Sequence, residues 1–461
     1  MTLLIQNGEI ITDTEQIRAD VLCEGDKITR VGPNLQAPAG ATVVSAAGKY
    51  VFPGFVDPHV HVYLPLKTTC SKDTYETASI AALAGGTTCV IDFCSPERDQ
   101  MPLDALAEWN DQSRGLSACD YSYHMAVTRF DPEVAEQLRE VIRRGISSLK
   151  IYLAYKDSVA LAVNQIADLM AFAAREGALV LGHCEDADEV DRLQKELFSA
   201  GRTGPEWHYH SRPPEIEALG TRRFLQIARE NGAHAYVVHL SCEEALKEAL
   251  TIGGLGERVW IETLISFLLL DRTYAERSNF EGAKYVVSPP LRERRNQKIL
   301  WKALADGTIS TLATDHAPFD FKGQKDMGRN DFRAIPNGMP TLEDRINLLY
   351  TYGVKAGKIS LNKMVDVAAT HPAKLFGLYP RKGAIQVGSD ADLVVYDPDC
   401  KGTISAKTHH MNVDYNPFEG WELAGRPSVV TVRGEIAFRD GVFVGTRGRG
   451  EFISRPACHF S

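Results

Sequence analysis

Short apolar runs alternate with longer amphipathic stretches from about residue 50 to about residue 320. Each run is rich in β-branched residues and lacks polar alternation, which is typical of strands buried on both faces of a parallel sheet. The stretches between them have helical spacing, so the pattern predicts βαβ units. The runs cover residues 50–56, 87–93, 121–127, 148–153, 178–181, 235–240, 259–263 and 309–313. Eight such units favour an α/β fold with a closed (β/α)₈ barrel of the TIM type.

The two ends of the chain follow a different pattern. The N-terminal segment alternates in short pieces separated by turns such as Asn7-Gly8, and the same style returns at Asp392–Tyr396. Turn-rich β segments at both ends predict one small β-sandwich domain that is built from both termini. We therefore expect the sandwich over residues 1–53 and 378–461, and the catalytic barrel over residues 54–377.

Composition and charge narrow the functional classes. The 461 residues carry a formal charge of -9 and no basic block, which argues against nucleic acid or an anionic membrane as a partner and favours a small-molecule substrate. The N-terminus lacks the pattern of a signal peptide and no apolar run approaches a membrane span, so we expect a cytoplasmic protein. Nine cysteines without a Cys-x-x-Cys pair favour small core residues over a disulfide framework or a structural zinc knot.

Polar residues of metal-ligand type recur where the predicted strands end. His59 and His61 follow the first run, and in an extended chain residues two apart project to the same side, so both imidazoles can reach one ion. Two ordinary strand histidines are the alternative. His183, His239 and Asp315 follow the fifth, sixth and eighth runs. Four imidazoles and one carboxylate at the catalytic rim indicate ions of zinc type, and two ions more naturally than one.

Lys150, in the fourth run, does not fit a metal site as an amine. An ammonium cannot bind a metal ion and costs free energy when it is buried. Reaction with carbon dioxide would give a carbamate, which is anionic and has two oxygens able to bridge two ions. A Schiff-base lysine is the alternative reading, and the metal-type histidines argue against it.

Several longer motifs resemble those of the cyclic amidohydrolases, and the match extends over nearly the whole chain. They are Ser288-Pro289-Pro290-Leu291-Arg292, Thr314-Asp315-His316, Ile335-Pro336-Asn337-Gly338-Met339-Pro340 and Ala373-Lys374-Leu375-Phe376-Gly377-Leu378. The set is similar to that of the D-hydantoinase and dihydropyrimidinase group. The resemblance implies a metal-dependent amidohydrolase barrel with two divalent ions, usually Zn²⁺ with Mn²⁺ or Co²⁺ as alternatives, in a homotetramer or a homodimer.

The resemblance also implies a ligand set for the two ions. One ion would be bound by His59, His61 and Asp315, the other by His183 and His239, and Lys150 would bridge them as N6-carboxylysine.

Four residues receive further roles from the same resemblance. Asp315 would act as general base and then acid, taking a proton from the attacking water and passing it to the departing ring nitrogen. Tyr155 matches the family tyrosine that hydrogen-bonds the oxyanion. Ser288 and Asn337 match positions whose main chains bind the ureide group of the substrate.

The substrate is expected to be a small neutral cyclic ureide. Dihydroorotases share the Thr-Asp-His-Ala-Pro run, but their pattern has an arginine after the paired histidines for the substrate carboxylate, and here Lys67 is the nearest cation. We expect hydrolysis of 5-substituted hydantoins to N-carbamoyl amino acids, with dihydropyrimidinase activity on dihydrouracil or dihydrothymine as the alternative. Allantoinase is disfavoured because Asn337-Gly338 matches the hydantoinase group, and a non-catalytic dihydropyrimidinase-like scaffold because all six ligand positions are intact.

Two features depart from the group pattern. Ala317 stands where many hydantoinases have cysteine, and the loop Asp157–Asn164 lacks the aromatic and acidic residues that relatives often show there. Relatives use this loop and the segment matching Tyr63–Leu66 to enclose the ring substituent. The sequence therefore leaves the size and stereochemistry of that substituent open.

Overall fold

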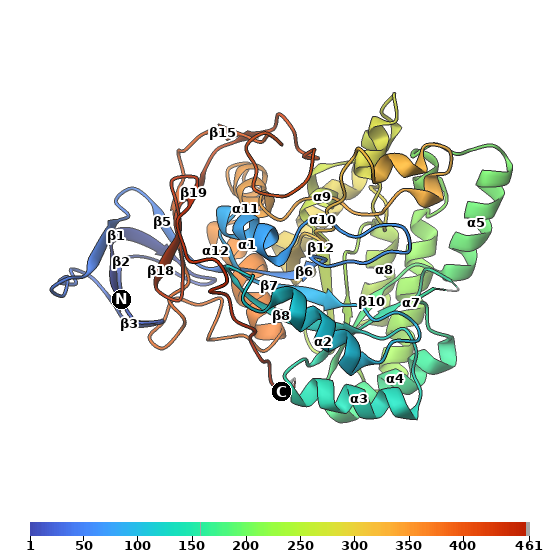
Figure 1. Ribbon diagram of the computed structural model, residues 1–461, viewed down its shortest axis with the longest axis horizontal. Helices are drawn as coiled ribbons and strands as arrows, with labels where there is room; N and C mark the ends of the chain where they lie inside the picture. The colour runs from blue at the N-terminus through green and yellow to red at the C-terminus, as the bar shows by residue number, and fades with distance from the viewer. Residues whose placement is uncertain (157, 458–461) are drawn as a thin grey trace.

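A barrel of eight parallel strands and a second β-sheet make up the computed structural model, which describes residues 1–156 and 158–457 (Figure 1). Asp157 of the substituent loop and Cys458 lie outside the described residues. Barrel neighbours follow chain order, and the barrel closes where the His61 amide donates to His316 O at 2.7 Å. The barrel strands are β6 (Phe55–Val60), β7 (Thr87–Cys94), β8 (Asp120–Ala126), β9 (Ser148–Tyr152), β10 (Leu179–His183), β11 (His234–Val237), β12 (Val259–Leu264) and β13 (Thr311–Ala313). The predicted fold class is confirmed.

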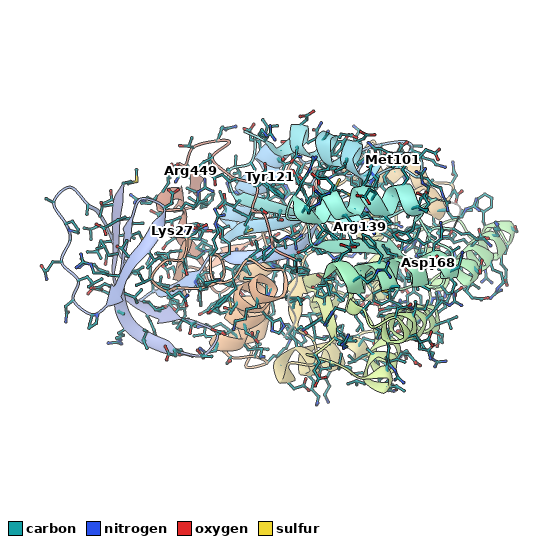
Figure 2. The ribbon with its side chains drawn as sticks, turned by 90° about the horizontal axis from the view of Figure 1, so that it is seen from below. Lys27, Met101, Tyr121, Arg139, Asp168 and Arg449 are labelled. Atoms are coloured by element: carbon teal, nitrogen blue, oxygen red, sulfur yellow. The ribbon has the colours of Figure 1, made fainter. Side chains whose placement is uncertain are left out.

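Helices surround the barrel, and α3 (Pro132–Arg143) shows how their sequences specify them. Asp131 caps its first turn and Pro132 occupies the first helical position. Buried positions recur at helical spacing, while Arg139 on the outer face pairs with Glu176 at 2.9 Å (Figure 2). The other helices are α1 (Tyr75–Ala84), α2 (Pro102–Ser113), α4 (Val163–Glu176), α5 (Ala187–Ser199), α6 (Trp207–His210), α7 (Pro214–Glu230), α8 (Glu243–Ile252), α9 (Ile265–Leu269), α10 (Arg295–Asp306), α11 (Arg345–Leu349), α12 (Leu361–Val365) and α13 (His371–Leu375). The described residues also form four 3₁₀ helices, η1 (Arg272–Glu276), η2 (Glu281–Tyr285), η3 (Lys325–Gly328) and η4 (Phe332–Ala334), and two π-helical segments, η5 (Tyr350–Val354) and η6 (Asp366–Thr370).

Both chain ends contribute strands to the second sheet, at the left of Figure 1, as the turn-rich pattern predicted. Its order is β19-β18-β17-β14-β5-β1-β2-β3, with β4 paired to β1. These strands are β1 (Thr2–Ile11), β2 (Gln16–Glu24), β3 (Lys27–Gly32), β4 (Thr42–Ser45), β5 (Tyr50–Pro53), β14 (Leu393–Asp397), β17 (Arg426–Val432), β18 (Glu435–Arg439) and β19 (Val442–Phe443). A separate pair is formed by β15 (Gly402–Thr403) and β16 (Glu422–Leu423).

The first predicted barrel strand, 50–56, is wrong in its bounds. The structure divides this run between two sheets, because β5 pairs with the terminal strands β1 and β14 while β6 pairs with β7. Gly54 makes the change possible, since a Cβ there would collide with the side chains of Thr88 and Asp392. Both halves of the run are buried, so apolar character could not show the change of sheet. The other seven predicted runs overlap the observed strands.

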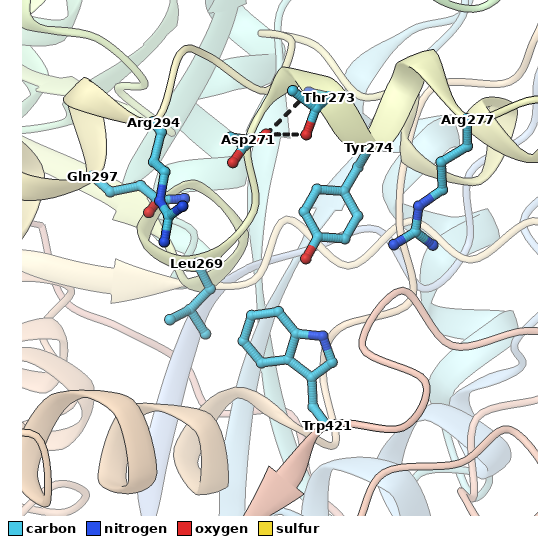
Figure 3. A pocket seen from close by; sticks show the side chains of 8 residues that line it. All are labelled: Leu269, Asp271, Thr273, Tyr274, Arg277, Arg294, Gln297 and Trp421. Atoms are coloured by element: carbon cyan, nitrogen blue, oxygen red, sulfur yellow. Dashed lines mark hydrogen bonds between the residues drawn. The ribbon is translucent and has the colours of Figure 1, made fainter.

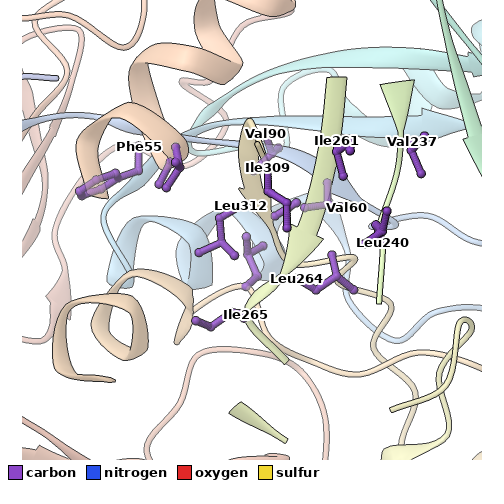
Figure 4. Close-up of a cluster of buried hydrophobic side chains, with 14 of the residues drawn as sticks. Phe55, Val60, Val90, Val237, Leu240, Ile261, Leu264, Ile265, Ile309 and Leu312 are labelled. Carbon is purple, nitrogen blue, oxygen red and sulfur yellow. The ribbon is translucent and has the colours of Figure 1, made fainter. Parts of the chain in front are cut away.

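Aliphatic side chains from several barrel strands pack with helix residues in the largest apolar cluster, which lies between the strands and the surrounding helices (Figure 4). Val60, Val237 and Ile261 come from β6, β11 and β12, and each is at most 1% exposed. All positions of β7 are buried, as expected for strands covered on both faces. Six cysteines are likewise buried, as predicted for core residues: Cys23, Cys89, Cys94, Cys119, Cys184 and Cys242. Among the described residues no helix is long and apolar enough to cross a membrane.

A buried ionic cluster joins the two sheets at the amino end of the barrel. Lys382 Nζ lies 2.5 Å from Asp120 at the start of β8, and 2.7 Å from Asp392 beside β14. Burial opposes the charge on Lys382, but the surrounding carboxylates outweigh this and raise its pKa well above the usual value. The C-terminal segment adds a backbone link, because the amide of Tyr121 (labelled in Figure 2) donates to Glu451 O at 3.0 Å. This cluster leaves the opposite rim, at the carboxyl ends of the barrel strands, free for the predicted site residues.

Candidate metal centre

Three predicted ligands meet where the barrel closes. His59 lies on β6, His61 follows this strand, and Asp315 follows β13. The Nε2 atoms of His59 and His61 lie 3.1 and 3.2 Å from the same oxygen of Asp315. All three residues are buried, and each offers a ligand atom within 4.8 Å of the others. Within the described part of the chain this is the one cluster of histidine, cysteine and carboxylate side chains with that geometry.

Glu262 orients this group from within β12. Its Oε1 lies 2.7 Å from His59 Nδ1, and the same oxygen accepts the backbone amide of His239 at 2.9 Å. A carboxylate that holds one imidazole nitrogen leaves the other nitrogen for an ion. The sequence analysis did not predict Glu262 as a site residue, although a lone carboxylate inside the apolar run 259–263 could have indicated one.

Electrostatic attraction between the histidines and the carboxylates stabilises the charged forms of His59 and Asp315. Burial lowers the pKa of His59, but Glu262 and Asp315 outweigh it and raise the pKa to about 9. Burial likewise raises the pKa of Asp315, yet His59 and His61 reverse this and hold it well below its usual value. Asp315 is therefore a carboxylate at neutral pH.

The remaining predicted ligands come from three neighbouring strands: His183 ends β10, His239 follows β11 by two residues, and Lys150 lies within β9. The imidazole rings of His183 and His239 are 4.6 Å apart, and His239 lies 5.4 Å from the ring of His59. His183 Nε2 lies 2.7 Å from Glu185 Oε2, which leaves Nδ1 as the nitrogen for an ion. The structure thus brings these histidines beside the first three ligands.

Lys150 lies between the two groups of histidines. It is 1% exposed, and its Nζ lies 4.9 Å from the centre of the Phe93 ring. Burial lowers its pKa to about 8. Burial also lowers the pKa values of His61 and His183, and the charge of Lys150 adds a smaller effect in the same direction. No carboxylate among the described residues forms an ion pair with it. A neutral amine is the form of lysine that reacts with carbon dioxide, so this burial favours the predicted carbamate.

Orphaned imidazole nitrogens give an independent test of a metal site. Among the described residues, His61 Nδ1 and His239 Nδ1 are buried without a hydrogen-bond partner. Buried polar atoms normally have partners, and neutral imidazole nitrogens are common zinc ligands. The donor set therefore fits divalent ions of zinc type.

The three residues predicted to contact substrate also meet. The Tyr155 hydroxyl lies within hydrogen-bond reach of the Ser288 and Asn337 side chains, and Asn337 Nδ2 donates to Ser288 Oγ at 3.0 Å. Tyr155 has a φ of 64°, a strained value for a tyrosine. Burial raises the pKa of its phenol, which therefore keeps its proton and can act as a donor. Its ring lies 5.3 Å from that of His183, next to the candidate metal ligands.

A buried ion pair supports Tyr155 and His183 together. Arg212 Nη1 lies 2.5 Å from Glu185 Oε2, and the Arg212 guanidinium lies 5.2 Å from the centre of the Tyr155 ring. Burial alone would raise the pKa of Glu185, but Arg212 and His183 lower it to about 2. The sequence reading missed this pair, because Arg212 lies 27 residues beyond Glu185.

His316 turns away from the metal ligands despite its place in the Thr314-Asp315-His316 motif. Its Nε2 lies 2.9 Å from Asp73 Oδ2, and Asp73 also accepts the backbone amide of Asn412 at 2.8 Å. A segment between β15 and β16 thereby reaches the rim of the barrel. The motif therefore supplies one predicted ligand, Asp315, and one residue, His316, that holds the rim of the barrel through Asp73.

A surface cavity of about 440 Å³ lies away from the candidate metal centre (Figure 3). Tyr274 and Trp421 form part of its wall, and Asp271 is its one carboxylate. Asp271 accepts hydrogen bonds from Thr273, and none of the described residues that line the cavity is a histidine. None of the predicted site residues belongs to it, so its size does not make it the reaction site.

Comparisons with known proteins place these observations in a family. A model of the amidohydrolase family matches residues 50–437. A D-hydantoinase of Geobacillus stearothermophilus is 46% identical over 456 residues, which cover 99% of this chain and 97% of that protein. Among solved structures, a D-hydantoinase (dihydropyrimidinase) from Thermus sp. has a TM-score of 0.97 at 54% identity, covering 99% and 100% of the two chains. A dihydropyrimidinase from Brevibacillus agri NCHU1002 has a TM-score of 0.97 at 43% identity, covering 99% of each.

Proposed function

Because this chain belongs to the amidohydrolase family, we propose that it hydrolyses the ring amide of 5-substituted hydantoins to N-carbamoyl amino acids. The observation that carries the proposal is the meeting of two predicted groups at one rim. The candidate metal ligands lie around Lys150, and the group formed by Tyr155, Ser288 and Asn337 lies directly beside His183. The relatives named D-hydantoinase supply the substrate class.

The proposed cofactor is a pair of divalent ions, with zinc preferred and Mn²⁺ or Co²⁺ as alternatives. Its ligands would be His59, His61, Asp315, His183, His239 and Lys150 as N6-carboxylysine. When bound, such ions polarise a carbonyl and lower the pKa of water toward neutrality.

The protein's own groups then account for proton transfer and charge. Asp315 is ionised and close to both histidines, so it can take the proton of the attacking water and deliver it to the ring nitrogen as the C–N bond breaks. The Tyr155 hydroxyl can donate to the oxygen that becomes negative. The main chains of Ser288 and Asn337 would hold the ureide. Water adds its hydroxyl to the carbonyl carbon and its proton to the nitrogen.

The charges around the site favour a neutral substrate. Arg212 is the guanidinium beside Tyr155, and Glu185 neutralises it. Lys67, the nearest cation after the paired histidines, is exposed. Neither of these two cations is both buried and unpaired, so neither is suited to bind a substrate carboxylate. This supports hydantoins over dihydroorotate.

A kinetic panel tests the proposal. It would compare separated enantiomers of 5-aryl and 5-alkyl hydantoins with hydantoin, dihydrouracil and dihydroorotate. We expect the highest kcat/KM on a 5-substituted hydantoin and no turnover of dihydroorotate. Dihydrouracil as the best substrate would establish the second candidate, dihydropyrimidinase activity, which the likeness to a dihydropyrimidinase supports. We also propose a homotetramer, which light scattering would check against a dimer.

A further inference from the structure

Lys325 is a fully buried lysine without a role in the proposed chemistry. It opens the short helix η3 and has an exposed fraction of 0%. Its Nζ lies 2.8 Å from Pro336 O and 3.2 Å from Val286 O. No carboxylate of the described residues forms an ion pair with it, and burial lowers its pKa to about 7. Burial of an amino group without a counter-ion is unfavourable. The cost in stability suggests that Lys325 has a functional role.

The two carbonyl groups belong to the segments that contain Ser288 and Asn337. Pro336 directly precedes Asn337, and Val286 precedes Ser288 by two residues. Gly338 N also donates to Val286 O, at 3.0 Å. The lysine therefore joins two segments that are far apart in sequence at the point where they approach each other.

Neither segment is held by a strand or a helix at these positions. The joined carbonyls gain the partners that a sheet would otherwise provide. The Lys325 amide donates to Asp320 O at 3.0 Å, which fixes the lysine, and Val286 and Ile335 pack in one apolar cluster. On the other side, His208 Nε2 lies 3.0 Å from Val287 O and 3.1 Å from Ser288 Oγ. Lys325 Nζ contacts a carbonyl of each segment and so adds to the two direct hydrogen bonds between them, Gly338 N to Val286 O and Asn337 Nδ2 to Ser288 Oγ.

We propose that Lys325 is a positioning residue that sets the distance between the 286–288 and 336–338 segments and thereby the affinity for the ureide. The inference rests on the proposed function, because it assumes that the main chains of Ser288 and Asn337 bind that group. It goes beyond that function because it assigns control of the distance between the two substrate-binding segments to Lys325, a side chain outside the reaction site.

Lys325→Met removes the hydrogen-bond donors of the amino group and keeps an unbranched side chain. The matched control is Lys322→Met, because Lys322 is exposed in the same loop. In Lys325→Met we expect KM for the best hydantoin to rise about ten-fold or more, because two buried carbonyls lose a donor. We expect kcat to stay within about three-fold, since the reacting groups are unchanged. Metal content and the Lys322→Met kinetics should match those of the wild type.

Amide hydrogen exchange gives a second readout that needs no substrate. In Lys325→Met, amides of residues 286–291 and 335–339 should exchange faster than in the wild type, and Lys322→Met should show no change. If the wild type hydrolyses none of the panel, the proposed function fails, while the exchange result still tests the contact. Should Lys325→Met not fold, Lys325→Gln, whose shorter side chain reaches less far, is measured in its place. A folded Lys325 variant with wild-type KM, or with wild-type exchange in both segments, overturns the proposal.

Discussion

The two halves of the candidate metal centre differ in how far folding alone assembles them. In the half formed by His59, His61 and Asp315, three ligand atoms lie within 4.8 Å of one another. In the half formed by His183 and His239, two imidazole rings lie 4.6 Å apart, and the further predicted ligand is the amine of Lys150. The first half contains a carboxylate among its predicted ligands and the second does not.

Charge explains this difference. Asp315 supplies a carboxylate to the first half, and its low pKa keeps it ionised. Glu185 contacts His183 in the second half, but Arg212 neutralises it. A divalent ion bound by two neutral imidazoles needs a negative ligand. If the proposed ligand set is right, the second half depends on carboxylation of Lys150, whereas folding alone brings the three ligands of the first half together.

Removal of Lys150 should have the largest effect on this contrast. We expect Lys150→Ala to abolish activity because the proposed bridging ligand is lost, and a small added carboxylic acid to restore part of it by occupying the vacated space. Turnover with and without acetate or propionate would be measured together with metal content. Lys302→Ala, which alters an exposed lysine paired with Asp306, is the control. Normal turnover and full metal content in Lys150→Ala without added acid would show that the bridge is misassigned.

Metal reloading should separate the halves directly. Protein stripped by a chelator and reloaded in buffer free of carbon dioxide should bind about one ion per chain, because the first half already has its anion. Addition of bicarbonate should raise this to about two ions and restore activity. Elemental analysis of both samples gives the count. Two tightly bound ions in the sample without carbon dioxide would remove the distinction between the halves.

Tyr155 lies beside the second half, and its loss should affect the reaction rather than assembly. We expect Tyr155→Phe to lower kcat by about 10²- to 10³-fold, or roughly 2.7 to 4 kcal/mol, as when one oxyanion donor is removed. KM should change little, because the lost hydrogen bond strengthens as charge develops. Metal content should stay normal. A wild-type kcat on a good hydantoin would make the tyrosine a pocket wall.

Glu262 contacts both halves, through the His59 ring and the His239 amide, and should have the smallest effect of the four. We expect Glu262→Gln to lower metal affinity by about 10- to 100-fold, the usual consequence of losing a carboxylate behind a metal-binding histidine. Competition with a chelator measures this affinity. Glu257→Gln alters an exposed carboxylate that precedes the same strand and serves as the control. Equal affinities in the two variants would argue against an orienting role.

Much of the fold and several ligand candidates could be predicted from local patterns. The apolar runs identify the strands because burial on both faces of a barrel strand excludes polar alternation. His59 and His61 could be paired because two residues apart in a strand face the same way. The bounds of the first barrel strand could not be predicted, because the change of sheet at Gly54 depends on close contacts of this residue with Thr88 and Asp392.

The sequence by itself determined the class of protein and the chemical types at the strand ends, since both follow from short-range periodicity and motifs. Only the tertiary structure decided which groups act on which. Glu262 and His59 are 203 residues apart, and the contacts of Lys325 with Val286 and Pro336 join segments that no local pattern connects. The physical reason is that burial creates partners: a carboxylate or an amine in a strand or loop gains its role from the atoms that folding places around it.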